Sequence, residues 1–223
     1  MLVLAVDTSG RNGSITLARG DATSFELIET VALEGGTFSA QLVPQIAALL
    51  ASHGFKKRDI GGFAVASGPG SFTGLRVGLA AIKALAEILG QPIAAVSRLE
   101  VLAVASGAQG HVVTALDAGR SEVYSGEYNL EGSDARMLSE QLLPLDDFLR
   151  QMRGKAIVTP DAIIADAAGG AGVAVTVVDP MKDGYLARVG IGRILAGQTV
   201  KPAELEANYI RRSDAEIFAK HDS

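Results

Sequence analysis

The sequence predicts an α/β protein built from two duplicated halves, each with a mixed sheet flanked by helices. Short apolar runs alternate with longer segments of helical periodicity along most of the chain. A strand that ends in aspartate, followed by a turn and a second strand, occurs at the start and again about 110 residues later, which places Asp7 on Asp117. We therefore expect a first half over residues 1–106, rejoined by 203–223, and a second half over 107–202.

The first half begins with an unbroken apolar run, Leu2–Val6, which predicts a buried strand. Asn12-Gly13 is typical of a type I′ hairpin turn, so Ser14–Ala18 is expected to pair back antiparallel. Phe25–Leu33 can add a third strand, and Thr37–Ser52 has the apolar spacing of a helix. The elements expected to complete this half are strand Gly62–Ala66, helix Phe72–Leu89, strand Ile93–Val96 and helix Ser97–Ser106.

The second half repeats this alternation. The strands expected there are Val112–Asp117, Glu122–Tyr128, Met137–Leu142, Lys155–Val158 and Val173–Val178, and the helices are Leu145–Met152 and Tyr185–Ala196. Gly197 is placed to end the last helix as its C′ residue. The run Ala165–Gly172 consists mostly of alanine and glycine and is expected to be a loop.

A glycine-rich turn joins the strand Gly62–Ala66 to the long helix. Gly68 and Gly70 permit unusual backbone angles or a close backbone approach, and Ser71 is a plausible N-cap. Such a turn can hold a phosphate at a helix N-terminus. However, Gly68, Gly70 and Gly74 are spaced one residue wider than the dinucleotide fingerprint, and no P-loop lysine follows. The alternative is a tight turn before a capped helix.

The helix Phe72–Leu89 has more apolar surface than one packing face needs. Its charged side chains, Arg76, Lys83 and Glu87, share one narrow stripe. The helix either lies within its own domain or packs on its sheet on one side and on a partner on the other. In the second interpretation this helix and the helix from Phe38 to Leu50 together form a bundle with the same two helices of a homologous partner. The candidate partner contacts are Phe38, Leu42, Gln45, Gly74, Leu75, Gly78, Ala81 and Ile82.

Composition excludes several classes of function. The sequence has no cysteine, which excludes disulfides, thiolate metal sites and a cysteine nucleophile. No apolar run approaches ~20 residues and no secretory signal is present, so a cytoplasmic protein without membrane contact is expected. A net charge of -5 argues against an autonomous nucleic-acid binder. His53, His111 and His221 lack zinc-site spacing, and no GxSxG elbow of a serine hydrolase occurs.

Five segments carry a resemblance to a known family. They are Val6–Ser9, Ser67–Arg76, Ser97–Glu100, Leu116–Tyr124 and Tyr209–Ala215. The chain resembles the TsaB (YeaZ) family of bacterial proteins, which takes part in making threonylcarbamoyladenosine in tRNA. This resemblance implies an actin-like fold of the ATPase, sugar-kinase and Hsp70 group. It also implies a non-catalytic paralogue of TsaD that binds TsaD and TsaE, forms a homodimer when TsaD is absent, and leaves tRNA contact mainly to the complex.

The resemblance also implies which nucleotide-binding residues of this fold the chain retains. ATPases and kinases of this group use a carboxylate at the end of the first strand, where Asp7 and Asp117 stand. The phosphate hairpin is reduced, because no glycine follows Asp7 directly. TsaD's His-x-x-x-His metal pair is absent, and Phe38 stands where the family often has a histidine. The vestigial nucleotide-binding residues would be Asp7, Ser9, Gly68, Gly70 and Asp117.

We therefore expect no catalytic residue, no metal, no cofactor and only weak ATP binding by the isolated chain. Two other classes remain for comparison. One is an ATP-dependent small-molecule kinase that uses Asp7 and the Gly68–Gly70 loop. The other is a dinucleotide-binding enzyme, which would need an acidic residue at the tip of the strand after the long helix. That tip reads Val96-Ser97-Arg98, which disfavours the second class.

Overall fold

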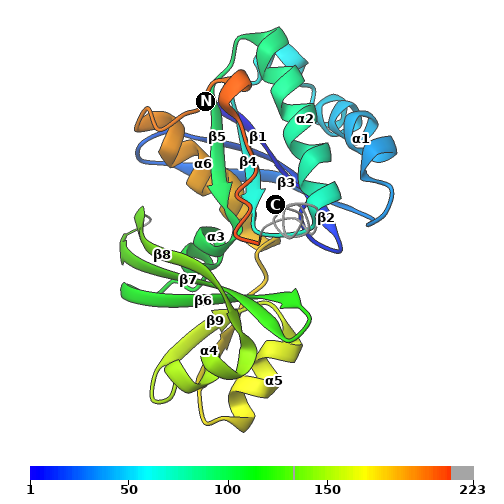
Figure 1. Cartoon of the computed structure of the whole chain (residues 1–223). Coiled ribbons are helices and arrows are strands. Elements are labelled where there is room, and N and C mark those ends of the chain that lie inside the picture. The colour runs from blue at the N-terminus through cyan, green and yellow to red at the C-terminus, as the bar shows by residue number, and fades with distance from the viewer. Residues whose placement is uncertain (133, 212–223) are drawn as a thin grey trace, which may run out of the picture.

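The computed structural model describes residues 1–132 and 134–211 and contains two mixed five-stranded sheets of the same topology (Figure 1). In each sheet three antiparallel strands are followed by two parallel ones, so the orders β3-β2-β1-β4-β5 and β8-β7-β6-β9-β10 correspond strand by strand. This confirms the duplicated actin-like fold. The first sheet comprises β1 (Leu2–Asp7), β2 (Gly13–Gly20), β3 (Phe25–Leu33), β4 (Gly62–Gly68) and β5 (Ile93–Ser97). The second comprises β6 (Gly110–Gly119), β7 (Glu122–Glu131), β8 (Asp134–Pro144), β9 (Ala156–Thr159) and β10 (Ala174–Val177).

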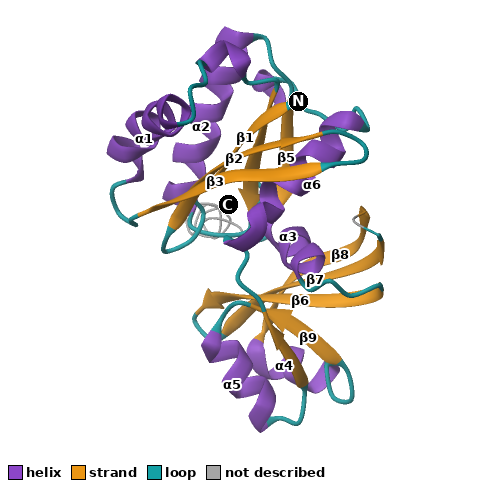
Figure 2. Ribbon diagram, turned by 180° about the vertical axis from the view of Figure 1, so that it is seen from behind, coloured by secondary structure: helices purple, strands orange, loops and turns teal. Residues whose placement is uncertain are grey.

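The helices form three layers around these sheets. α1 (Phe38–Ser52) and α2 (Phe72–Leu89) cover the outer face of the first sheet, and α4 (Leu145–Gln151) and α5 (Ala162–Gly170) cover the outer face of the second. α3 (Arg98–Ala105) and α6 (Tyr185–Leu195) lie between the sheets, as Figure 2 shows from behind. Short 3-10 turns occur at Lys57–Asp59, Lys182–Gly184 and Pro202–Glu204.

The two inner helices are exchanged between the halves. α3 follows the first sheet but packs against β6, β7 and β8, whereas α6 follows the second sheet but packs against β1, β4 and β5. A Cβ atom on Gly190 of α6 would overlap that of Ala64 on β4, so this packing is close. Thus α3, which lies within the expected range 1–106, packs on the second sheet, and α6, which lies within 107–202, packs on the first. Leu205 lies in the core of the first half and Asn208 bonds to β4, whereas Arg211 pairs with Glu122 of the second half. Residues 212–223 lie outside the described part.

The first hairpin differs from its prediction. β1 and β2 pair antiparallel as expected, but their last register pair is Asp7 with Ser14, and neither Asn12 nor Gly13 has a positive φ. The connection is therefore a longer loop rather than a type I′ turn. Gly13 serves a packing role, because a Cβ there would lie 2.8 Å from the Phe38 ring.

The run Ala165–Gly172 is mostly helical, which corrects the expected loop. α5 spans Ala162–Gly170, and Gly172, with φ 73°, follows its end. Alanine has the highest helix propensity, and the glycines of this run stand at the C-terminal end, where they cost least. Among the described residues, no helix combines the length and the apolar character needed to cross a bilayer.

Candidate functional site

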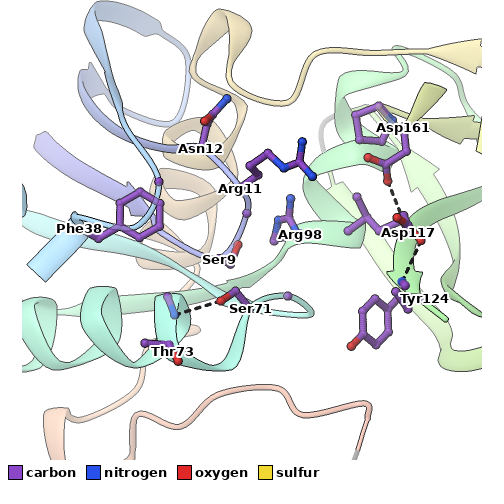
Figure 3. Close-up of a pocket in the computed structure, with 18 of the residues that line it drawn as sticks. Ser9, Arg11, Asn12, Phe38, Ser71, Thr73, Arg98, Asp117, Tyr124 and Asp161 are labelled. Atoms are coloured by element: carbon purple, nitrogen blue, oxygen red, sulfur yellow. Dashed lines mark hydrogen bonds between the residues drawn. The ribbon is translucent and has the colours of Figure 1, made fainter. Parts of the chain in front are cut away.

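A cleft of about 1180 Å³ opens between the two halves (Figure 3). Its first wall consists of the β1–β2 loop, the start of α2 and Arg98, and its second wall consists of the end of β6 and the start of α5. Described parts of all five segments that carry the family resemblance contribute lining residues. The cleft residues taken from these segments include Ser9, Gly70, Ser71, Thr73, Gly74, Arg98, Leu116, Asp117, Ala118, Gly119, Tyr124 and Arg211.

Asp7 is satisfied by its own surroundings. Its Oδ1 accepts the Ser9 backbone N–H at 2.8 Å and also the Ser9 hydroxyl. Its Oδ2 lies 3.5 Å from Nε of Arg98, whose Nη1 donates to the Pro69 carbonyl at 3.0 Å. The carboxylate thus accepts hydrogen bonds from its own turn and pairs with one guanidinium, an arrangement that joins β1, the glycine-rich turn and α3.

The glycine-rich turn packs on the β1–β2 loop. A Cβ on Gly70 would overlap the Ser9 carbonyl oxygen, which accepts the Ser71 N–H at 2.7 Å. The Ser71 hydroxyl accepts the Gly74 N–H at 3.3 Å, which confirms Ser71 as the N-cap of α2. Gly68 has φ 125°, and a Cβ there would lie 2.8 Å from the Asn208 carbonyl oxygen. Close packing within the chain therefore accounts for these glycines.

Asp117 repeats the turn of Asp7 but faces the cleft. Its Oδ1 accepts the Gly119 N–H at 2.8 Å, and its own N–H donates to Oδ2 of Asp161 at 2.7 Å. Of the expected nucleotide-binding residues, Ser9 and Gly70 therefore line the first wall and Asp117 the second, whereas Asp7 and Gly68 lie behind the first wall and do not line the cleft.

Most of the other cleft residues were absent from the expected site, among them Arg98, Tyr124, Asp161 and Arg211. Arg98, Tyr124 and Arg211 belong to the segments that carry the resemblance, whereas Asp161 had no sequence signal. Arg211 forms an ion pair with Glu122 and lies 5.9 Å from the centre of the Tyr124 ring. Burial raises the pKa of Tyr124 above its ordinary value, so its hydroxyl is protonated at neutral pH.

Within residues 1–132 and 134–211, no three His, Asp or Glu side chains gather in a way that could hold a metal ion. His53 pairs with Glu29 at 2.6 Å and His111 with Glu127 at 2.9 Å, both at the surface. His221 lies outside the described residues.

The expected partner contacts lie mostly inside the first half. Gly78 and Gly74 face β1, because a Cβ on either would overlap Thr8, whose hydroxyl donates to the Gly74 carbonyl at 2.7 Å. A partner contact at these two glycines stays a prediction. The small residues do allow a close approach, but the approaching backbone is the chain's own. Phe38, Leu42, Leu75 and Ile82 are buried in the same core, and Gln45 and Ala81 are half-buried.

A different set of side chains forms the exposed outer face of α1 and α2. Val43 is 57% exposed and Phe72 40% exposed. A hollow of about 480 Å³ lies between the two helices, and a second of about 510 Å³ lies between α2 and the segment near Tyr209. We call this surface the outer helical face; its residues are Ser39, Val43, Phe72, Thr73, Arg76, Val77, Ala80 and Ala81.

Comparison with known proteins places these features in a family. Residues 35–173, more than half of the chain, match the family model described as "TsaD: tRNA N6-adenosine threonylcarbamoyltransferase". The chain is 35% identical to the tRNA threonylcarbamoyladenosine biosynthesis protein TsaB of Bacillus subtilis over 158 residues, 70% of this chain and 67% of that protein. It is 32% identical to TsaB of Escherichia coli over 131 residues, 57% of this chain and 55% of that protein.

Solved structures agree over a longer stretch. YeaZ from Pseudomonas aeruginosa superposes with a TM-score of 0.76 at 25% identity, covering 93% of this chain and 99% of that one. The sequence matches, in contrast, span only about half to two thirds of the length of these two TsaB relatives. The fold is therefore shared along nearly the whole chain, and sequence similarity is concentrated in part of it.

Proposed function

The chain belongs to the TsaB (YeaZ) family, and from this membership we propose that it is a non-catalytic subunit in the synthesis of threonylcarbamoyladenosine in tRNA. In this role it binds TsaD and, together with TsaE, supports transfer of the threonylcarbamoyl group to the tRNA adenosine beside the anticodon. The chain itself makes few contacts with tRNA, in keeping with its net charge of -5.

The outer helical face carries this proposal. α1 spans 15 residues and none of them is charged, although Val43, Pro44 and Ala47 are exposed. A surface helix ordinarily presents polar and charged side chains to water. Contiguous exposed apolar surface next to a hollow is typical of a protein–protein contact. We propose that TsaD packs its own helices against α1 and α2, and that a second copy of this chain takes that place when TsaD is absent.

The cleft supports the non-catalytic part of the proposal. The Asp7 carboxylate already pairs with Arg98 and accepts from Ser9, and the Ser71 amide already donates to the Ser9 carbonyl. A nucleotide phosphate with Mg²⁺ would have to displace these contacts. We therefore propose that ATP and Mg²⁺ are used by the partners in the complex, with no cofactor held by this chain.

A charge placed on the outer helical face tests the partner assignment. Val43→Asp would bury an unpaired carboxylate in the contact, at a cost of several kcal/mol, so affinity for TsaD from the same genome should fall by about a hundredfold or more. Val177→Asp is the matched control, since Val177 is 64% exposed on β10 of the other half. Titration calorimetry on both variants, with melting curves to confirm folding, gives the comparison. Equal affinities for wild type and Val43→Asp would refute the assignment.

The cleft is large enough for a small-molecule ligand, so one alternative function needs a test. It is an ATP-dependent small-molecule kinase that uses Asp7 and the Gly68–Gly70 loop. Binding and turnover of ATP with Mg²⁺ by the isolated chain distinguish the two functions. We expect weak binding and no turnover. Micromolar affinity together with turnover that Asp7→Asn abolishes would replace the subunit proposal by the kinase.

A further inference from the structure

The segment Leu205–Arg211, which we call the C-terminal strap, connects both halves (Figure 1, orange to red). Leu205 is buried in the core beneath α1 and α2. Asn208 donates its backbone N–H to the Ser67 carbonyl at the end of β4, at 2.7 Å. Arg211 then pairs with Glu122 on β7 of the second half. In seven residues the strap therefore passes from the core of the first half to the sheet of the second.

Glu140 on β8 holds the middle of the strap. Its Oε2 accepts the Asn208 side-chain amide at 2.7 Å, and its Oε1 accepts the hydroxyls of Ser97 and Tyr128. Burial raises the pKa of Tyr128 far above its ordinary value, so this hydroxyl remains a donor. One half-buried carboxylate thus collects donors from β5 of the first half, β7 of the second half and the strap.

The strap also contacts the outer helical face at the first turns of α2. The Tyr209 ring lies 5.2 Å from the Phe72 ring, and the Tyr209 hydroxyl accepts from Nε of Arg76 at 3.3 Å. The Arg76 guanidinium in turn stacks 3.7 Å from the centre of the Phe72 ring. Tyr209, Arg76 and Leu205 also line the hollow beside α2. The position of the strap therefore affects the first turn of α2 and the side chains exposed there.

We propose that the C-terminal strap couples the arrangement of the two halves to the outer helical face. Glu140 fixes Asn208, Asn208 fixes the neighbouring Tyr209, and Tyr209 orders Phe72 and Arg76. Coupling between two sites is reciprocal, so a protein bound to the outer helical face would in turn tighten the contact between the halves. The part of this inference that concerns a bound protein rests on the function proposed above.

Exchanging the donor and the acceptor in the hydrogen bond between Asn208 and Glu140 tests this coupling on the isolated chain. Asn208→Asp has the same shape but sets a carboxylate against Glu140, and it leaves the backbone bond to Ser67 in place. We expect hydrogen–deuterium exchange in residues 72–80 to become about tenfold faster. Adding Glu140→Gln supplies an amide donor to the introduced carboxylate and should restore most of the protection. Glu127→Gln, on the β7 surface, is the control and should leave exchange unchanged.

Affinity for TsaD measured on the same variants completes the test. Asn208→Asp should weaken binding about tenfold, and the double variant should recover it. Unchanged exchange in Asn208→Asp would overturn the coupling, and so would faster exchange that Glu140→Gln fails to rescue, because that is local damage. If the wild type does not bind TsaD, the proposed function fails, while the exchange data still decide whether the strap couples the halves to α2.

Discussion

The outer helices of the two halves occupy equivalent places in the duplicated fold but present different surfaces. α1 has 15 residues without a charge, whereas α4, which follows the third strand of its own sheet in the same way, carries Asp146, Asp147 and Arg150 within seven residues. The next pair differs in how it packs. α2 lies on its sheet through Gly74 and Gly78, whereas a Cβ on Gly169 or Gly170 of α5 would meet nothing within 4 Å. Duplication preserved the topology, and the outer helices diverged in their charge and in how closely they pack on their own sheet.

The largest expected effect comes from adding a methyl group to the glycines of α2. Gly78→Ala would overlap the Thr8 hydroxyl and push α2 away from β1, so we expect the free energy of unfolding to fall by roughly 3 kcal/mol. Gly169→Ala on α5 has open space and should be neutral or stabilising by up to ~1 kcal/mol. Urea denaturation compares the two. If the Gly78→Ala variant is as stable as the wild type and loses only its binding to TsaD, Gly78 instead lies in the contact with TsaD.

The pair between the exchanged helices should give a pH dependence. Burial raises the pKa of Glu100 on α3 above its ordinary value of 4.5, and Arg193 on α6 opposes this only in part. A carboxyl whose folded pKa is raised favours folding when it is protonated. The free energy of unfolding should therefore fall as pH rises from about 4.5 through the folded pKa, by at most ~1.4 kcal/mol per pH unit.

Glu100→Gln should flatten this slope, and urea midpoints measured between pH 4.5 and 7 would detect the change. Asp21→Asn is the control with the opposite sign, because the Thr23 backbone N–H lowers the pKa of Asp21 to about 2. Its contribution is present above its unfolded pKa of 3.8 and is lost only as pH falls toward 2. A wild-type slope that Glu100→Gln leaves intact would assign the dependence to another group.

The next expected effect is smaller and compares the stability losses from replacing the equivalent aspartates Asp7 and Asp117. Asp7→Asn removes the charge that faces Arg98, so we expect a loss of about 1 kcal/mol. Asp117→Asn keeps an oxygen that can accept from Gly119 and should cost only ~0.3 kcal/mol. Thermal melts at pH 7 measure both. Equal losses would mean that the ion pair with Arg98 contributes nothing beyond the turn that the two aspartates share.

The smallest expected difference between two equivalent positions concerns the two hairpins. Arg120 and Ser121 both have φ 57° and form the two-residue turn between β6 and β7. Ser121→Gly should relieve this conformation and stabilise the fold by ~0.5 kcal/mol. Asn12→Gly, at a position without positive φ, should give no gain. A difference in urea midpoint between the two variants confirms where the tight turn lies, and a gain from Asn12→Gly would contradict it.

Local signals predicted most of the elements correctly. Ser71 before α2 and Gly90 after it, with φ 65°, mark the bounds Phe72–Leu89 that the sequence predicts. Buried strands followed from unbroken apolar runs. The exchange of α3 and α6 could not be predicted, because an apolar stripe shows that a helix face is buried but not which sheet covers it. The same limit explains Gly74 and Gly78, whose size signals a close neighbour without identifying it.

The candidate site was predictable only in part for a related reason. Asp7, Gly68, Gly70 and Asp117 stand at or close to the ends of strands, so their position near one end of the sheets could be inferred from the alternation of elements. The partner of Asp7, Arg98, begins α3, four strands later along the chain, and Asp161 bonds to Asp117 from the N-cap position of α5. These pairs depend on how the two halves meet, which no local pattern describes.

The exchanged helices also affect how the chain folds during synthesis. The inner face of the first sheet, with Val3, Ala5 and Ala64, is covered by α6, whose last residue is translated about a hundred residues after β5. At ~5–20 residues per second, that face stays uncovered for roughly 5–20 seconds. We expect ribosome-bound chains that have not yet released residues 185–195 to be cleaved readily by protease within β1–β5, and longer ones to resist. The first half is made first but can be completed only by one of the last helices to leave the ribosome.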